Sequence, residues 1–145
     1  MREGISIQMH SKAGVEGDEA LIHIDKQSRI PIYEQLVEAL QQEILNGFLV
    51  PGELIPSVRS LSMELSVNPN TIQKAYNELE RLQITYSVPG VGRYISNQAV
   101  ELVKKEKAGA KLALSQAIKD LKASGMSLAE LLETVEQYYG GGAND

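Results

Sequence analysis

The stretch that decides the fold is VNPNTIQKAYNELE, residues 67–80. Asn68 is a residue type that caps the N-terminus of a helix. Pro69 is tolerated at the first helical position, where its missing N–H would have no partner within the helix. Apolar residues then recur with the spacing of one helix face: Ile72, Ala75, Tyr76 and Leu79. The pattern predicts a helix that begins at Pro69 with a polar first turn.

Two shorter signals precede this helix. An apolar stripe with a period close to four residues runs from Ile32 to Leu45 and ends at Asn46-Gly47, as expected for a first helix. Pro51-Gly52 suits the central positions of a type II turn. Ser57 is the expected N-cap of a second helix that covers residues 57–66.

A hairpin is predicted after Leu82, because the β-rich segments ITYSV (84–88) and GRYIS (92–96) flank a turn at Pro89-Gly90. The order of helix, helix, tight turn, helix and hairpin is that of a winged helix-turn-helix. The fold class expected is mainly α with a small β-hairpin, and this unit covers residues 23–97.

The flanking segments are expected to differ from this unit. Residues 1–22 are interpreted as a disordered leader, although ALIHID (20–25) alternates weakly and suggests one short strand. Residues 98–139 are expected to form a two-helix tail that is split at Ser124-Gly125, with Ser127 as the N-cap of the second tail helix. Residues 140–145 are expected to be a flexible end. The first tail helix can gather Val103, Leu114, Ala117, Ile118 and Leu121 on one face, and the second Leu128, Leu131, Leu132, Val135 and Tyr139.

Composition limits the chemistry. The 145 residues carry a net charge of −5, no cysteine, and two histidines, His10 and His23. A disulfide framework and a thiolate metal site are therefore excluded. Glu78 and Glu80 do not share a helix face, so they are a poor pair for acid-base catalysis. No apolar run approaches the ~20 residues of a membrane span. We expect a cytoplasmic protein that is not an enzyme and has no metal or cofactor.

The polar entrance of the third helix is the main candidate site. Side chains near the N-terminus of a recognition helix read base edges in the major groove, and Asn, Gln and Thr suit this task. The candidate DNA-binding residues are Ser57, Arg59, Asn68, Asn70, Thr71, Gln73, Lys74, Gly90 and Arg93. Each also has a structural interpretation: a cap for Asn68, a solvated face for its neighbours, a surface arginine for Arg59, and an ordinary tight hairpin for Gly90 and Arg93.

The segments PIYEQ, PGELIPSVRSL, NPNTIQKAYNELE and PGVG closely resemble the DNA-binding domain of the GntR family of bacterial transcription regulators. The resemblance covers about residues 28–97, and the short tail is similar to the YtrA-type branch. It implies a regulator, with repression expected, that binds a palindromic operator as a homodimer, often at a transporter operon. Family DNA contacts fall on Arg59, Asn68, Asn70, Thr71, Gln73 and Gly90. The tail faces would pair through Leu114, Ile118, Leu121, Leu128, Leu131, Leu132 and Val135.

Two features favour a different function, that of a winged-helix protein-interaction module without DNA binding. Over residues 25–97 acidic side chains outnumber basic ones, whereas binding to phosphates favours a basic surface. Val91 also stands where many relatives have Lys or Arg. If the protein does bind DNA, this charge balance predicts modest nonspecific affinity. The sequence indicates no effector and no operator sequence.

Overall fold

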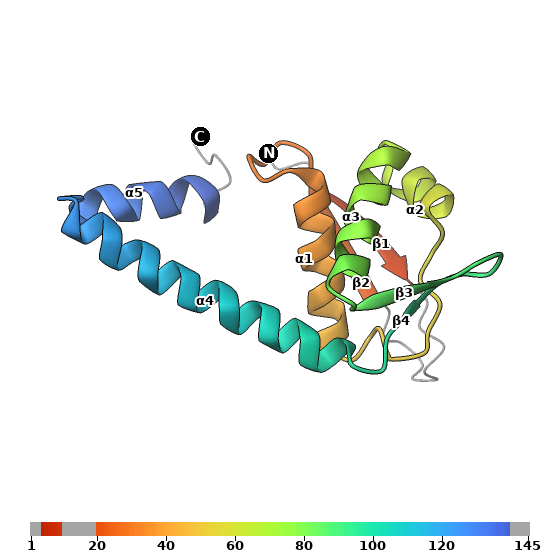
Figure 1. Ribbon diagram of the computed structural model, residues 1–145. Coiled ribbons are helices and arrows are strands. Elements are labelled where there is room, and N and C mark those ends of the chain that lie inside the picture. Colours follow the sequence, from red (N-terminus) through yellow and green to blue (C-terminus); the bar gives the residue numbers. More distant parts are fainter. Residues whose placement is uncertain (1–3, 10–19, 140–145) are drawn as a thin grey trace.

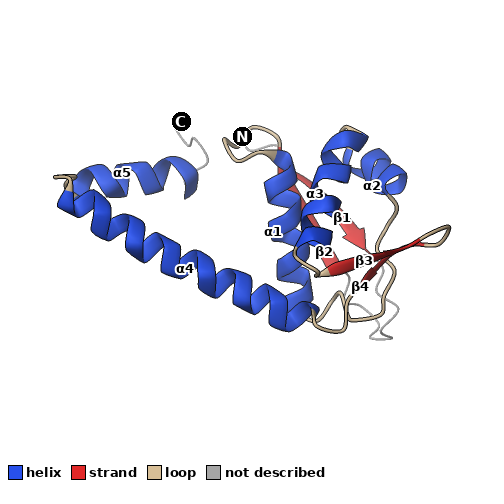
Figure 2. Cartoon of the chain, viewed as in Figure 1, coloured by secondary structure: helices blue, strands red, loops and turns tan. Residues whose placement is uncertain are grey.

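The computed structural model describes residues 4–9 and 20–139. A body of helices and two small sheets carries a long arm that is made by the last two helices (Figure 1). The elements are β1 (Gly4–Met9), β2 (Ala20–Asp25), α1 (Ile32–Leu45), α2 (Val58–Leu65), α3 (Pro69–Arg81), β3 (Thr85–Val88), β4 (Gly92–Ile95), α4 (Ala99–Ala123) and α5 (Leu128–Tyr139). The expected fold class is confirmed, since helices predominate over short strands (Figure 2).

The first strand departs from expectation. β1 pairs with β2 in an antiparallel register from Gly4 opposite Asp25 to Met9 opposite Ala20. A disordered leader is therefore the wrong description for residues 4–9, while residues 1–3 and 10–19 lie outside the described part of the chain. The strand expected at 20–25 is present as β2. Its alternation has a physical reason, because Ile22 and Ile24 are both fully buried in the core.

The N-caps that were predicted for α2 and α3 are found. The Ser57 hydroxyl accepts the N–H of Ser60 at 3.0 Å, and Asn68 Oδ1 accepts the N–H of Asn70 at 2.8 Å. Both bonds satisfy donors that have no partner within their helix. Pro69 follows Asn68 as the first residue of α3. The sequence NPN therefore starts this helix.

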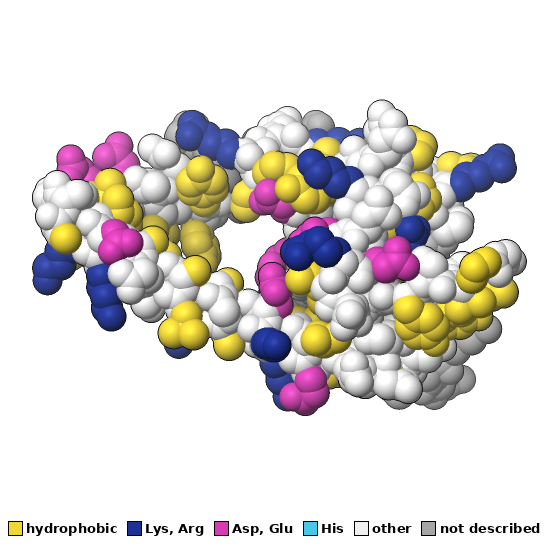
Figure 3. Space-filling view, viewed as in Figure 1, with side chains coloured by type: hydrophobic (Ala, Val, Ile, Leu, Met, Phe, Trp, Pro, Cys, Tyr) yellow, Lys and Arg dark blue, Asp and Glu magenta, His cyan; other side chains and the backbone are white. Residues whose placement is uncertain are grey.

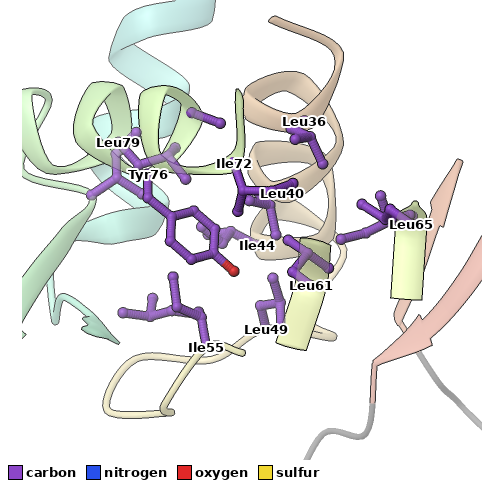
Figure 4. Close-up of a cluster of buried hydrophobic side chains, with 14 of the residues drawn as sticks. Leu36, Leu40, Ile44, Leu49, Ile55, Leu61, Leu65, Ile72, Tyr76 and Leu79 are labelled. Carbon is purple, nitrogen blue, oxygen red and sulfur yellow. The ribbon is translucent and has the colours of Figure 1, made fainter. Parts of the chain in front are cut away.

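One hydrophobic core holds the helices of the body together (Figure 4). The predicted apolar faces meet there, and loop residues complete the cluster: Leu36, Leu40, Ile44, Leu49, Ile55, Leu61, Leu65, Ile72, Ala75, Tyr76 and Leu79. Tyr76 is the largest of these side chains, and its hydroxyl donates to the carbonyl of Pro56 at 2.7 Å. This bond ties the middle of α3 to the entrance of α2.

The hairpin β3–β4 gains a third segment from the loop between α1 and α2. Ile55 N–H donates to Arg93 O at 2.9 Å, and Ile95 N–H donates to Glu53 O at 2.9 Å. Gly52, in the expected Pro-Gly turn, has φ +86°, which side chains with a Cβ rarely adopt. The turn thus directs the loop alongside β4 and fixes the hairpin to the body.

The arm starts inside the body. Ala99 and Val103 of α4 are fully buried in the core, and Lys107 Nζ lies 2.6 Å from Glu38 Oε1 of α1. Val103 therefore belongs to the core and not to the apolar face of the tail. Beyond this base α4 is exposed, and α5 has no buried residue. Ile118 keeps 37% of its surface exposed and Leu128 keeps 71%.

Candidate nucleic-acid interface

The start of α3 lies at the surface, directly after the turn that ends α2. Asn68, Pro69 and Asn70 are exposed, and Thr71 is half-buried. The turn before them is held by Ser66, which has φ +53°, and by the buried Ser62 hydroxyl, which donates to Val67 O at 2.6 Å. The turn orients α3 with its polar first turn outward. Among these residues Asn70 keeps its side chain free of the cap.

Ser57 and Arg59 lie at the start of α2. Both are exposed, and they line a shallow depression together with Ser60, Met63 and Glu64. Ser57 uses its oxygen to cap α2 but retains its O–H as a donor. A hydroxyl and a guanidinium at a helix start suit phosphate oxygens or a guanine edge.

A polar chain joins α3 to β4 and was not predicted. Gln73 Nε2 donates to Asn77 Oδ1 at 2.8 Å, and Arg93 Nη2 donates to the same oxygen at 3.3 Å. The guanidinium carbon of Arg93 lies 5.4 Å from the centre of the Tyr76 ring. We name Gln73, Asn77 and Arg93 the wing clamp. The four-residue spacing of Gln73 and Asn77 could have suggested their contact, but the sequence contained no sign of Arg93 beside them.

Lys74 takes a different direction from the other candidates on α3. Its Nζ lies 3.9 Å from the centre of the Tyr33 ring on α1, a cation–π contact. It lines a groove between α1, α3 and α4 that also contains Glu34, Glu78 and Lys107. The Tyr33 hydroxyl donates to Glu34 at 3.2 Å, which raises the pKa of Tyr33. Lys74 is thus brought to α1 and not to the wing clamp.

The wing, which is the β3–β4 hairpin, is apolar at its tip. Gly90 is exposed with φ +76°, and a Cβ there would meet no atom within 4 Å. The glycine is therefore required by backbone conformation and not by crowding. Val91 is 57% exposed, and the Tyr86 and Tyr94 rings stack at 5.7 Å. Hydrophobic side chains gather over this hairpin in Figure 3.

Charge is dispersed over the molecule. In the view of Figure 3 the basic side chains are separated from each other, and acidic ones stand between them. Over residues 4–9 and 20–139 no group of His, Cys, Asp and Glu is placed to hold a metal ion. None of the helices in those ranges is long and apolar enough to cross a membrane. A DNA contact here would depend on individual side chains more than on a basic surface.

Comparison with known proteins agrees with this geometry. Residues 32–95 match the family described as bacterial regulatory proteins, gntR family. The HTH-type transcriptional repressor YtrA of Bacillus subtilis (strain 168) is 40% identical over 81% of this chain and 91% of its own. The uncharacterized HTH-type transcriptional regulator YhcF of the same organism is 34% identical over 80% and 96%.

Two solved structures share the fold. A transcriptional antiterminator from Listeria monocytogenes EGD-e superimposes with a TM-score of 0.58 at 37% identity, covering 80% of this chain and 87% of the other. YtrA from Sulfolobus acidocaldarius, a GntR-family transcription factor, gives a TM-score of 0.51 at 32% identity, covering 63% and 97%. The family match lies on the helices and the hairpin that carry the candidate site, and the chain belongs to the GntR family of bacterial regulatory proteins.

Proposed function

We propose that the protein is a sequence-specific DNA-binding transcription regulator, and a repressor, that binds a palindromic operator as a homodimer. The observation that carries this proposal is the exposure of the α3 entrance, with Asn68 capping the helix while Asn70 projects from it. Arg59 at the start of α2 and Gly90 at the wing tip flank that entrance in the chain. Such an arrangement suits a helix in the major groove and a hairpin beside it.

The proposed DNA contacts are of two kinds, those to base edges and those to phosphates. Arg59, Asn70 and Gln73 are proposed to read base edges, because their side chains offer paired donors and acceptors. Ser57, Thr71 and the first-turn N–H groups of α3 are proposed to contact phosphates, since a helix N-terminus attracts anions. Asn68 contributes mainly by holding that turn. Arg93 supports the surface through the wing clamp.

Dimerisation is proposed through the arm. The apolar side chains of its two helices are half-buried or exposed in the single chain: Leu114, Ile118, Leu121, Leu128, Leu131, Leu132 and Val135. Burying such surface against a second copy yields roughly 25 cal/mol per Å². A two-fold axis through the arms would present two α3 helices to the two halves of a palindrome. Repression would follow from occupation of promoter DNA, and the gene class expected is a transporter operon.

Fluorescence-anisotropy titration tests the proposal. The full chain is titrated with duplex from the promoter region of its own gene and with scrambled duplex, each at two salt concentrations. We expect much tighter binding to the promoter, and Arg59→Ala and Asn70→Ala should each abolish the preference while leaving the dimer intact. Arg81→Ala is the matched control, because Arg81 pairs with Glu78 at the C-terminal end of α3. Equal and weak binding to both duplexes would instead support the interaction module.

A further inference from the structure

The wing clamp fixes the direction in which Gln73 presents its amide group. A guanidinium only donates hydrogen bonds, so the atom of Asn77 that faces Arg93 Nη2 has to be the oxygen. The group of Gln73 that meets the same oxygen then has to be the amide nitrogen, at 2.8 Å. The orientation of Gln73 therefore follows from a residue on a different element, β4.

This orientation leaves a defined pattern of free groups. Gln73 uses one of the two hydrogens on Nε2, which leaves one N–H and the Oε1 acceptor. Among the described residues neither Gln73 Oε1 nor Asn77 Nδ2 has a hydrogen-bond partner. Adenine presents the N7 acceptor and the N6 donor in the major groove, and one acceptor beside one donor complements that edge. Guanine, which presents two acceptors there, requires two donors.

We infer that Asn77 and Arg93 are positioning residues that hold the Gln73 amide in the one orientation that selects adenine. The inference rests on the proposed function, because it concerns the base-reading face of the same helix. Gln73 would touch the base, while Asn77 and Arg93 act through it. Packing against the Tyr76 ring restrains Arg93, whose Nε is buried.

Loss of Arg93 has a specific consequence. Without the guanidinium, the Asn77 amide can turn and donate from Nδ2 to Gln73 Oε1. Gln73 then presents both N–H groups outward, and two donors complement the N7 and O6 acceptors of guanine. The structure thus links a wing residue to base choice under the recognition helix, without requiring that the wing residue touch that base.

Selection from a randomised duplex pool, followed by sequencing, tests the inference on the full chain. For the wild type we expect an adenine in each half-site that Gln73→Ala no longer selects. Arg93→Ala should accept guanine at that position as readily as adenine and keep the other base preferences. Asn77→Asp retains an acceptor for Gln73 and Arg93, so it should keep the adenine while binding all duplexes more weakly. Arg81→Ala removes an equal charge away from the clamp and should select the wild-type site.

A base analogue gives the second measurement. Replacing that adenine with 7-deazaadenine removes the N7 acceptor, and this should weaken wild-type binding roughly tenfold but weaken binding of Gln73→Ala, which lacks the amide, much less. A wild type that enriches no sequence would refute the proposed function itself. A wild type that enriches a site whose base choice is unchanged in Arg93→Ala and Asn77→Ala would refute only the positioning role.

Discussion

At the scale of single residues, Asn68 and Asn70 show how two side chains of the same type serve different purposes. Asn68 accepts the N–H of Asn70 and caps α3. Asn68→Ala should lower the free energy of unfolding by about 1 kcal/mol. Asn70→Ala removes an exposed side chain and should change it by less than about 0.5 kcal/mol, yet lose promoter binding. Urea denaturation and anisotropy on both variants separate the roles. An equal loss of stability in the two would contradict this assignment.

Tyr76 gives a second residue-scale prediction. Burial raises its pKa strongly, and its hydroxyl bonds the Pro56 carbonyl at 2.7 Å. Tyr76→Phe keeps the ring in the core but leaves that carbonyl without its donor, so the free energy of unfolding should fall by about 1 kcal/mol. Tyr33→Phe is the matched control, because its hydroxyl bonds an exposed Glu34. Chemical denaturation measures both, and a larger effect at Tyr33 would refute the argument.

At the scale of elements, α5 begins with a reciprocal capping box. Ser127 Oγ accepts the N–H of Glu130 at 3.1 Å, and Glu130 Oε2 accepts the N–H of Ser127 at 2.8 Å. Two hydrogen bonds from Ser127 to the Glu130 carboxylate, the first from the backbone N–H and the second from the hydroxyl, lower the pKa of Glu130 below its ordinary value of 4.5. A lowered pKa in the folded state stabilises the fold above the unfolded value. That contribution is lost as the pH falls through the folded pKa.

Glu130→Gln keeps an acceptor for the Ser127 N–H but does not titrate. The wild type should therefore lose more stability than Glu130→Gln as the pH falls from about 5 to about 2. Urea unfolding at a series of pH values measures the difference in the free energy of unfolding between the two proteins. The contributions of the other carboxyl groups are common to both proteins and cancel in this difference. A difference that stays constant over this range would show that the carboxylate does not stabilise the helix.

The elements also show what could be predicted from the chain alone. Caps and periodic apolar residues are local signals, so α2 and α3 begin at the predicted residues, Ser57 and Asn68 being their caps. β1 was missed because its partner lies many residues further on, and pairing of this kind has no local signal. Lys74 and Arg93 are both predicted from the sequence to contact DNA. Their actual contacts, Tyr33 and Asn77, depend on how the elements pack.

At the scale of the whole molecule, the exposed apolar face of the arm is the proposed dimer interface. Ile118→Asp puts a charge on the apolar face of α4 and should convert the dimer to a monomer, because a buried unpaired charge is costly. Gln116→Asp is the control: Gln116 is exposed, and two residues earlier on the helix it lies about 160° around the axis from Ile118. Sedimentation equilibrium measures both. Dimers that persist in Ile118→Asp, or that fail equally in Gln116→Asp, would contradict the proposed interface.

The charge of the whole molecule gives a further prediction. With a net charge of −5 and Val91 exposed at the wing tip, the proposed DNA-binding face has few cations to offer to phosphates. Val91→Lys should tighten binding to promoter and scrambled duplexes by similar factors. It should also steepen the slope of log affinity against log salt by about 0.9 per added phosphate contact. Anisotropy at four salt concentrations measures the slope. A gain for the promoter alone would mean that the wing tip reads sequence.

The buried start of α4 has a mechanical consequence. The helix has 25 residues, so it forms a rod about 37 Å long. It is anchored in the core only by its first turns, where Ala99 and Val103 are buried. A tilt of about 5° there displaces the far end by about 3 Å. In the proposed dimer, the distance between the two DNA-binding bodies would therefore depend on the packing of Ala99 and Val103, and larger side chains at these two positions should change the half-site spacing that the dimer prefers.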